Sequence, residues 1–313
     1  MRVILLFALS LSTSVLVAQH AFRVVPLGVK GGIDEQNLSA YLIAPSGQDQ
    51  FVSLDAGTLF TGVKKSVSNG AITGPPEIFL KNNVRAYLIS HAHLDHISGL
   101  ILNSTDDIQK EIYSLPKCLE IIKNHYFNWE SWPNFGNDGN APVLKKYQYY
   151  ALSVGREVRI ENTEMFVTAF PLSHSAPYES AAFLVRAGNK YALYFGDTGP
   201  DQMEKSNRIK QIWEVAAPLI RNGNMSGIFL EVSYPDEQPD SKLYGHLTPK
   251  WFMKEMENLS EGVGSDNMRG LKVIVTHIKP TGENEKTIRR QLLEANSLRL
   301  NLIFPEQGVG FDL

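Results

Sequence analysis

Three histidines and one aspartate crowd into the segment HAHLDH at 91–96. The segment directly follows an apolar β-type run at 84–90, and loops that leave a strand end often carry functional residues. His91 and His93 are two residues apart, so their side chains point the same way if the segment is extended. Polar groups packed this densely, with Asp95 and His96 beside them, would be costly to bury unless they bind something. Imidazole and carboxylate together suit Zn²⁺, Mn²⁺ or Fe, so the segment predicts a metal site.

Three further candidate ligands stand later in the chain, each at the end of an apolar run. His174 ends FVTAFPLSH, Asp197 ends KYALYFGD and His277 ends KVIVTH. A single histidine at a strand end is more often structural than functional. Three such coincidences beside the 91–96 segment indicate that all these residues belong to one site.

Composition limits the partners that such a site can serve. The 313-residue chain is 43% hydrophobic and has a formal net charge of −3, with no long block of one sign. A duplex-binding protein would normally show a basic face, so no nucleic-acid partner is expected. A small anionic substrate is compatible with the charge, because metal ions supply positive charge locally.

Short apolar β-type runs alternate with polar turns and outnumber the helices. The order is not a regular βαβ alternation, and two sheets packed face to face with helices outside would fit it, which is an α+β fold. No internal repeat or low-complexity linker interrupts residues 19–313, so we predict one domain there. Strands are predicted at 22–29, 40–45, 51–57, 84–90, 164–172, 181–188, 190–197, 227–233, 271–278 and 300–306, and helices at 98–102, 116–127, 208–220, from 248 onward, and at 286–296.

Residues 1–18 have the pattern of a signal peptide. Arg2 precedes an apolar run from Val3 to Ala18, and small residues near Ala18 offer a cleavage point. The run is shorter than the roughly 20 apolar residues that span a bilayer. We therefore expect cleavage, no membrane attachment afterwards, and a periplasmic or secreted protein. Cys118 is the single cysteine, which excludes an internal disulfide.

The pattern HxHxDH with a later His, Asp and His resembles that of the metallo-β-lactamase superfamily. The resemblance runs from Asp55 to His277 and implies a four-layer αββα sandwich with two metal ions between the sheet edges. It also implies that Asp55 orients ligands from beneath the site, the alternative being an aspartate that only shapes the turn before Gly57. The implied ligands are His91, His93 and His174 for one metal, Asp95, His96 and His277 for the other, and Asp197 as a bridge.

A narrower resemblance lies in HAHLDHISGLILNS at 91–104, which is similar to the signature of the class II cyclic-nucleotide phosphodiesterases. Thr105 stands where that family usually has Ala or Pro. GHLTP at 245–249 and THIKP at 276–280 are also similar to that family. The resemblance implies hydrolysis of cAMP, cGMP or both to nucleoside 5′-monophosphates by a hydroxide held between two divalent metal ions, which we expect to be zinc. Asp95 and Asp197 would position that hydroxide.

Two further roles are hypotheses about single segments. His246, just before a predicted helix start, is our candidate general acid for the leaving 3′ oxygen, and the alternative is that it only packs or holds a loop. The segment at 125–135 concentrates Tyr126, Phe127, Trp129, Trp132 and Phe135, which could stack on a purine. Core and dimer contacts are the commoner use of such side chains, and a homodimer is compatible with them. His125 itself is expected to be structural, and Tyr178 is a weaker candidate for the substrate pocket.

Two other functions stay open at this point. The first is another hydrolase of the same fold: a tRNA 3′-processing-like phosphodiesterase, a lactonase or a β-lactamase. The tRNA enzymes act in the cytosol, whereas this chain has a signal-peptide pattern and no basic arm. β-Lactamases often use a cysteine ligand, and Cys118 does not end a comparable strand. The second is a metal-dependent binding protein without turnover, which a hydrolysis assay would separate from an enzyme.

Overall fold

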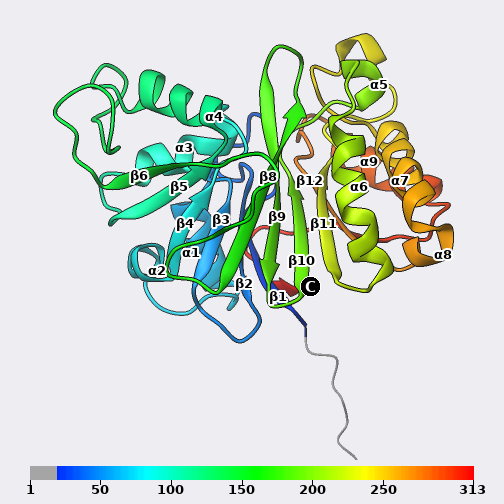
Figure 1. Ribbon diagram of the computed structural model, residues 1–313, viewed down its shortest axis with the longest axis horizontal. Helices are drawn as coiled ribbons and strands as arrows, with labels where there is room; N and C mark the ends of the chain where they lie inside the picture. The colour runs from blue at the N-terminus through cyan, green and yellow to red at the C-terminus, as the bar shows by residue number, and fades with distance from the viewer. Residues whose placement is uncertain (1–19) are drawn as a thin grey trace, which may run out of the picture.

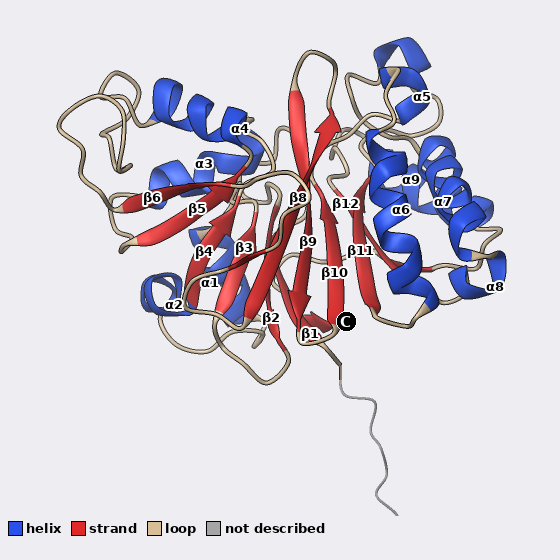
Figure 2. Ribbon diagram, in the orientation of Figure 1, coloured by secondary structure: helices blue, strands red, loops and turns tan. Residues whose placement is uncertain are grey.

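The computed structural model describes residues 20–313 as four layers, with two sheets packed face to face and helices on both outer faces (Figure 1 and Figure 2). Within the described residues, each sheet has seven strands. The predicted α+β fold, an αββα sandwich, is confirmed. The predicted signal peptide, residues 1–18, lies outside the described residues. None of the described helices is both long and apolar enough to cross a membrane.

The first sheet has the order β14-β1-β2-β3-β4-β5-β6, and β3 to β6 run parallel to one another. Its strands are β1 (Phe22–Gly28), β2 (Ala40–Pro45), β3 (Phe51–Leu54), β4 (Val84–Leu88), β5 (Lys110–Ser114), β6 (Tyr147–Ala151) and β14 (Phe311–Asp312). Its outer face is covered by α1 (Phe60–Ser68), α2 (Pro76–Asn83), α3 (Leu94–Asn103) and α4 (Pro116–Ile121), and α4 continues as a π-helical turn, η1 (Ile122–Tyr126).

The second sheet has the order β13-β12-β11-β10-β9-β8-β7, and β10 to β13 are parallel. Its strands are β7 (Val158–Arg159), β8 (Met165–Ser173), β9 (Glu179–Ala187), β10 (Lys190–Phe195), β11 (Met225–Glu231), β12 (Lys272–Thr276) and β13 (Asn301–Ile303). The helices on its outer side are α5 (Asp201–Glu204), α6 (Arg208–Arg221), α7 (Pro249–Val263), α8 (Ser265–Met268) and α9 (Asn284–Ala295), with a short 3₁₀ turn, η2 (Asp240–Lys242).

Three buried apolar clusters hold the layers together. One lies between the sheets and includes Leu54, Leu88, Phe183 and Phe229. The other two lie between each sheet and its helices. The central strands are therefore apolar on both faces, which is why they appear in the sequence as nearly continuous apolar runs. Burying each large side chain contributes about 1.5–3 kcal/mol, so the site stands on a rigid scaffold.

The predicted elements are found with small shifts in their boundaries. Every predicted strand is present, and α7 begins at Pro249 after Thr248, as expected for proline in a first turn. The helix predicted at 98–102 is longer and begins at Leu94, inside the histidine segment. The helix predicted at 116–127 changes to a π-helical turn at Ile122. Helices α1 and α2 and strands β5 and β6 were not predicted.

Candidate metal centre

The carboxyl ends of several parallel strands bring the predicted ligands to one edge of the sheets. In the first sheet, β3 ends just before Asp55 and β4 just before the segment at 91–96. In the second, β10 ends before Asp197 and β12 before His277. Strand β8 is antiparallel to β9, as is β10, so His174 at the end of β8 reaches the same edge. Ligands in open α/β sheets commonly bind beyond the carboxyl ends of strands.

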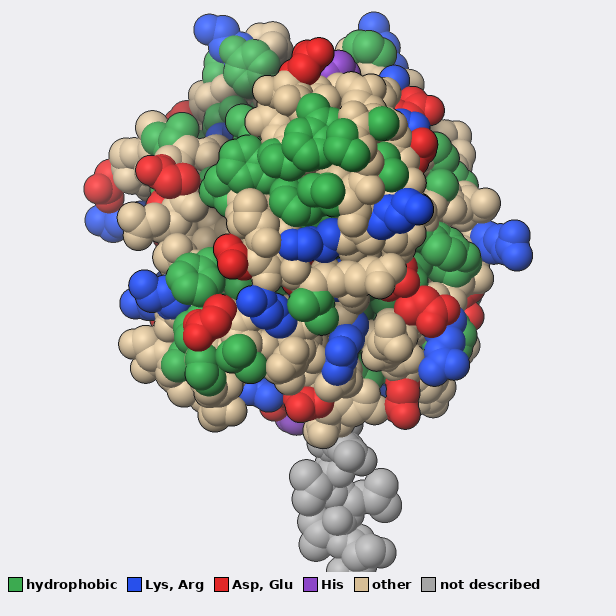
Figure 3. Space-filling view, turned by 90° about the vertical axis from the view of Figure 1, so that its left-hand side faces the viewer, with side chains coloured by type: hydrophobic (Ala, Val, Ile, Leu, Met, Phe, Trp, Pro, Cys, Tyr) green, Lys and Arg blue, Asp and Glu red, His purple; other side chains and the backbone are tan. Residues whose placement is uncertain are grey.

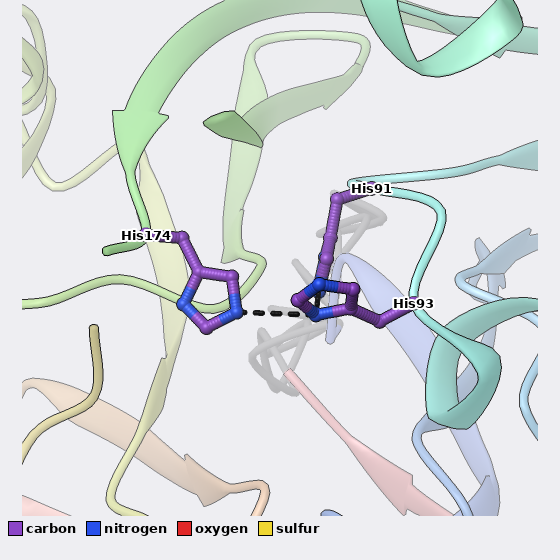
Figure 4. A group of neighbouring side chains, drawn as sticks. All are labelled: His91, His93 and His174. Carbon is purple, nitrogen blue, oxygen red and sulfur yellow. Dashed lines mark hydrogen bonds between the residues drawn. The ribbon is translucent and has the colours of Figure 1, made fainter. Parts of the chain in front are cut away.

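His91, His93 and His174 form one group of converging imidazoles (Figure 4). Nε2 of His91 lies 3.1 Å from Nδ1 of His93, and Nε2 of His174 lies 3.2 Å from the same atom. Burial lowers the pKa of His91 well below its usual value and that of His93 to about 4. Neutral imidazoles whose ring nitrogens converge are the form in which histidine binds metals.

Asp95, His96 and His277 form the second group. Nε2 of His277 lies 3.1 Å from Nε2 of His96 and 3.2 Å from Oδ2 of Asp95. The backbone N–H of Gly32 donates to the same Asp95 oxygen at 2.9 Å. Burial opposes ionisation of Asp95, but the neighbouring His96 and His277 outweigh it and hold the pKa of this carboxyl below its usual range.

Asp197 lies between the two groups. Its Oδ2 atom is 3.3 Å from Nε2 of both His96 and His277, and 3.7 and 3.8 Å from Nε2 of His91 and His174. Asp197 is 2% exposed. Burial alone would raise the pKa of Asp197, but His277 and His96 hold it well below the usual value. An ionised carboxylate at this point could bind a metal ion held by either group.

Asp55 lies beneath the second group and is fully buried. Its Oδ2 is 2.7 Å from Nδ1 of His96 and accepts a hydrogen bond from the Tyr194 hydroxyl at 2.6 Å. Ser90 donates to the same carboxylate from its backbone N–H at 2.7 Å and its hydroxyl at 2.8 Å. Since Nδ1 of His96 faces Asp55, its Nε2 is left to face the site. The structure thus places Asp55 against a candidate ligand rather than merely in a turn.

His246 also reaches the centre, together with two residues that the sequence did not reveal. Nδ1 of His246 lies 2.8 Å from Oε1 of Glu231, the last residue of β11, and 3.8 Å from Oδ2 of Asp197. Burial alone would lower the pKa of His246, but Glu231 and Asp197 outweigh it and raise the pKa. The Ser233 hydroxyl donates to Oε2 of Glu231 at 2.7 Å. A glutamate inside the apolar run GIFLEVS was the one signal in the sequence that could have pointed to this pair.

The aromatic segment at 125–135 contributes to the apolar cluster between the first sheet and its helices. Phe127 is fully buried in the core under the first sheet. Trp132 donates to the Ser104 hydroxyl at 3.0 Å, and the more exposed Trp129 donates to the Pro142 carbonyl at 2.8 Å. Figure 3, which faces this side of the molecule, shows hydrophobic side chains gathered in its upper half between charged ones. These contacts favour the packing role over the base-stacking hypothesis.

Tyr178 is an aromatic residue that stacks directly on a candidate ligand. Its ring stacks on His93 with centroids 4.4 Å apart and an interplanar angle of 12°. Burial raises the pKa of Tyr178 to about 12, so the hydroxyl stays protonated at neutral pH. By contrast, His125 is exposed on η1 and is not among the residues that could hold a metal.

The donor set fits divalent metal ions. Among the described residues, five sets of three ligand atoms lie within 4.8 Å of one another; they include the two groups above, one set of His91 and His96 with Asp197, and two sets that contain His246. Imidazole nitrogens and carboxylate oxygens are the ligands of zinc and related metals. The structure therefore brings every predicted ligand into one cluster that could hold metal ions.

A family model for class-II cAMP phosphodiesterases matches residues 76–308. The chain belongs to this family. A 3′,5′-cyclic-nucleotide phosphodiesterase of Aliivibrio fischeri is 42% identical over 302 residues, which cover 92% of each chain. Membership in this family confirms the resemblance seen in the sequence. It selects a class-II phosphodiesterase over the lactonase, β-lactamase and tRNA-processing alternatives and over a binding protein without turnover.

Solved structures agree with this class-II phosphodiesterase in fold. Unliganded yeast PDE1 superposes with a TM-score of 0.81 at 22% identity, covering 94% of this chain and 100% of its own. The metallo-beta-lactamase fold protein YhfI of Bacillus subtilis gives a TM-score of 0.60 at 16% identity, covering 93% of this chain and 99% of its own. At these identities the likeness concerns the fold alone, which is the one predicted.

Proposed function

We propose that this class-II phosphodiesterase is exported and hydrolyses 3′,5′-cyclic nucleotides, cAMP and cGMP, to nucleoside 5′-monophosphates with two zinc ions. One observation carries the proposal. Oδ2 of Asp197 lies between 3.3 and 3.8 Å from ring nitrogens of four candidate ligands that both sheets contribute: His91, His174, His96 and His277. A single buried carboxylate shared by two groups of imidazoles is the arrangement that a bridging ligand of a two-metal site requires.

In this proposal, His91, His93 and His174 hold one metal and Asp95, His96 and His277 hold the other. When bound, such a metal pair lowers the pKa of water and neutralises charge on phosphoryl oxygens. The protein residues determine the geometry of the ligands. Gly32 fixes Asp95 through its backbone N–H, and Asp55 fixes His96 through Nδ1.

His246 supplies the proton in the proposed reaction. Attack on phosphorus breaks the bond to the ribose 3′ oxygen, and the departing oxygen takes up a proton. Glu231 engages Nδ1 of His246 at 2.8 Å, which leaves Nε2 of the same ring to donate that proton. The raised pKa of His246 keeps the ring protonated to a higher pH than a free histidine, as a general acid needs.

Substrate identity is proposed from the relatives. The Aliivibrio fischeri protein is named a 3′,5′-cyclic-nucleotide phosphodiesterase, and at 42% identity the same substrate class is the simplest assignment for this chain. Export is proposed from the signal-peptide pattern of residues 1–18. Amino-terminal sequencing of the protein recovered from the producing cells tests export, because a start near Gln19 requires cleavage. The homodimer stays a prediction, which light scattering of the purified protein tests.

The function is tested with phosphorus NMR. The mature chain is loaded with zinc and incubated with 3′,5′-cAMP and, separately, with 3′,5′-cGMP. We expect 5′-monophosphates to appear and a chelator to stop the reaction. His93→Ala should lower the rate at least about 100-fold, because a lost ligand removes several kcal/mol of charge stabilisation.

His125→Ala is the matched control, since it removes an exposed imidazole outside the cluster and should leave the rate unchanged. If both cyclic nucleotides stay intact while about two zinc ions are bound per chain, the metal site stands and the substrate assignment fails. Equal losses in the two variants would refute the assignment of His93 to the site.

A further inference from the structure

Ser233 lies where the second ligand group meets the pair formed by Glu231 and His246. Its hydroxyl oxygen is 2.7 Å from Oε2 of Glu231, 2.9 Å from Nδ1 of His277 and 3.1 Å from Nδ1 of His246. The side chain is fully buried. Its backbone carbonyl accepts a hydrogen bond from Lys279 N–H at 3.3 Å, which holds the segment after β11 against the loop after His277.

Proton counting assigns a direction to each of these contacts. A serine hydroxyl has one proton and can accept two hydrogen bonds. The Glu231 carboxylate and the His277 backbone carbonyl, 3.2 Å away, both only accept, so the hydroxyl proton goes to one of them, and the shorter contact assigns it to Oε2 of Glu231. The contact between Ser233 and His277 must then be donated by His277 through an N–H at Nδ1. A neutral imidazole carries one N–H, so Nε2 of His277 is left bare.

Nε2 is the His277 atom that faces Asp95, His96 and Asp197, at 3.2, 3.1 and 3.3 Å. The hydrogen bond to Ser233 therefore selects the tautomer whose bare nitrogen faces the other candidate ligands. Metal-binding histidines commonly donate their other N–H to a protein group that fixes ring and tautomer. Asp55 plays this part for His96, and no carboxylate contacts Nδ1 of His277 in the described part of the chain.

The same hydroxyl also restrains Glu231. With Oε2 held by Ser233, Oε1 is directed to Nδ1 of His246 at 2.8 Å and to the backbone N–H of Thr198 at 3.1 Å. A continuous path of hydrogen bonds thus runs from the His277 ring through Ser233 and Glu231 to the His246 ring. Resting on the proposed two-metal function, we propose that Ser233 is a positioning residue, which fixes the tautomer of His277 for metal binding and the orientation of the Glu231–His246 pair.

The first test uses the wild-type protein loaded with zinc. Nitrogen-15 NMR of the histidine rings reports which ring nitrogen carries a proton. We expect His277 to carry it on Nδ1, with Nε2 free of hydrogen. Observing the proton on Nε2 of His277 would overturn the proposal, and this measurement requires no variant to fold.

The second test is Ser233→Ala, which removes the acceptor of His277 and one donor to Glu231. Zinc affinity is measured by competition with a chelator in the absence of substrate. We expect the weaker of the two zinc affinities to fall about 10–100-fold, as is typical when a partner of a ligand is removed. With zinc in excess, kcat should fall while KM changes little, because Ser233 acts on the ligand and the acid and not on substrate binding.

Ser66→Ala is the matched control, because Ser66 is also fully buried but its hydroxyl donates to the Gly62 carbonyl inside α1. It should leave zinc affinity and kcat unchanged. Unchanged zinc affinity and kcat in Ser233→Ala, or equal losses in both variants, would refute the positioning role. Since zinc affinity is measured without a nucleotide, a wrong substrate assignment would not alter this result.

Discussion

Asp55 and His96 form a buried pair in which the carboxylate lies 2.7 Å from Nδ1 of the ring. The aspartate also has a positive φ of 55°, a conformation that Asn tolerates and most residues do not. Asp55→Asn therefore keeps the backbone conformation while it removes the negative charge. It also places an NH₂ group among the hydrogen-bond donors of Ser90 and Tyr194. We expect zinc affinity to fall about 10–100-fold, measured by chelator competition.

Asp107→Asn is the control for that prediction. Asp107 is also buried and accepts hydrogen bonds from Tyr87 and Tyr147, but it pairs with Lys110 at the start of β5, away from the ligands. It should lower the free energy of unfolding and leave zinc affinity unchanged. If both variants lose zinc equally, the effect of Asp55 is on general stability and not on His96.

Gly99 shows why glycine stands in the segment that follows the histidines. A Cβ on Gly99 would lie 2.7 Å from the Ala56 carbonyl oxygen and 2.8 Å from the Leu59 nitrogen. At this close approach, the backbone N–H of Gly99 donates a hydrogen bond to the Gly57 carbonyl at 2.8 Å, which holds α3 against the loop that carries Asp55. Gly99→Ala should therefore destabilise the protein by about 1–3 kcal/mol in a denaturant titration, as overpacking does.

Gly262→Ala is the control for Gly99→Ala, because it should not lower the stability of the protein. Gly262 lies within α7, and the nearest contact of an added Cβ is an ordinary 3.4 Å to Cβ of Ala217. Alanine is favoured over glycine inside a helix by about 0.5–1 kcal/mol, so this variant should be as stable as the parent or more so. A stable Gly99→Ala protein would show that the loop and α3 can separate at little cost.

The candidate ligands were predictable because the sequence marks both their chemistry and their position. His174, Asp197 and His277 each follow an apolar strand. Strands that run in the same direction have their carboxyl ends at the same edge of the sheet. The grouping of these residues into two sets came from the family resemblance, since spacing along the chain gives no distance between sheets. The order of the predicted elements already favoured two sheets packed face to face with helices outside, and the resemblance added the specific αββα arrangement.

The unpredicted parts depend on contacts between distant segments. Glu231 and Ser233 look like the end of one more buried strand until folding brings His246 and His277 to them. Strands β5 and β6 have charged or tyrosine-rich sequences, and their first residues, Lys110 and Tyr147, are buried where both contact Asp107. A local pattern cannot reveal a polar residue whose partner lies far away in the chain.

Cys118 is predicted to be inert in the folded protein. It is 5% exposed, and burial raises its pKa to about 12. A thiol-reactive disulfide reagent at pH 8 should release one equivalent of chromophore only after denaturation, because the thiolate is the reactive form. Rapid reaction of the native protein would contradict the buried position.

The raised pKa of Cys118 makes the free energy of unfolding depend on pH. The unfolded thiol ionises near its ordinary pKa of 9.0, whereas the folded thiol keeps its proton up to about 12. Protons are thus lost preferentially by the unfolded state, and the contribution of Cys118 to the free energy of unfolding declines as pH rises above about 9. Cys118→Ala should show a shallower decline in urea titrations at pH 8 and pH 10.

His246 is placed to separate catalysis from metal binding. Its Nδ1 is held by Glu231 at 2.8 Å, so the ring borders the candidate ligands with that nitrogen already engaged. His246→Ala should therefore lower kcat about 10²–10⁴-fold while the zinc content stays at the parent value, as expected for a lost general acid.

Glu231→Gln should also lower kcat, but by a smaller factor than His246→Ala, because the His246 ring remains and loses only its anionic partner. A cyclic-nucleotide analogue with a better leaving group at the 3′ position needs less proton donation, so the defect of His246→Ala should shrink with it. A His246→Ala protein that has lost zinc would instead make His246 a ligand.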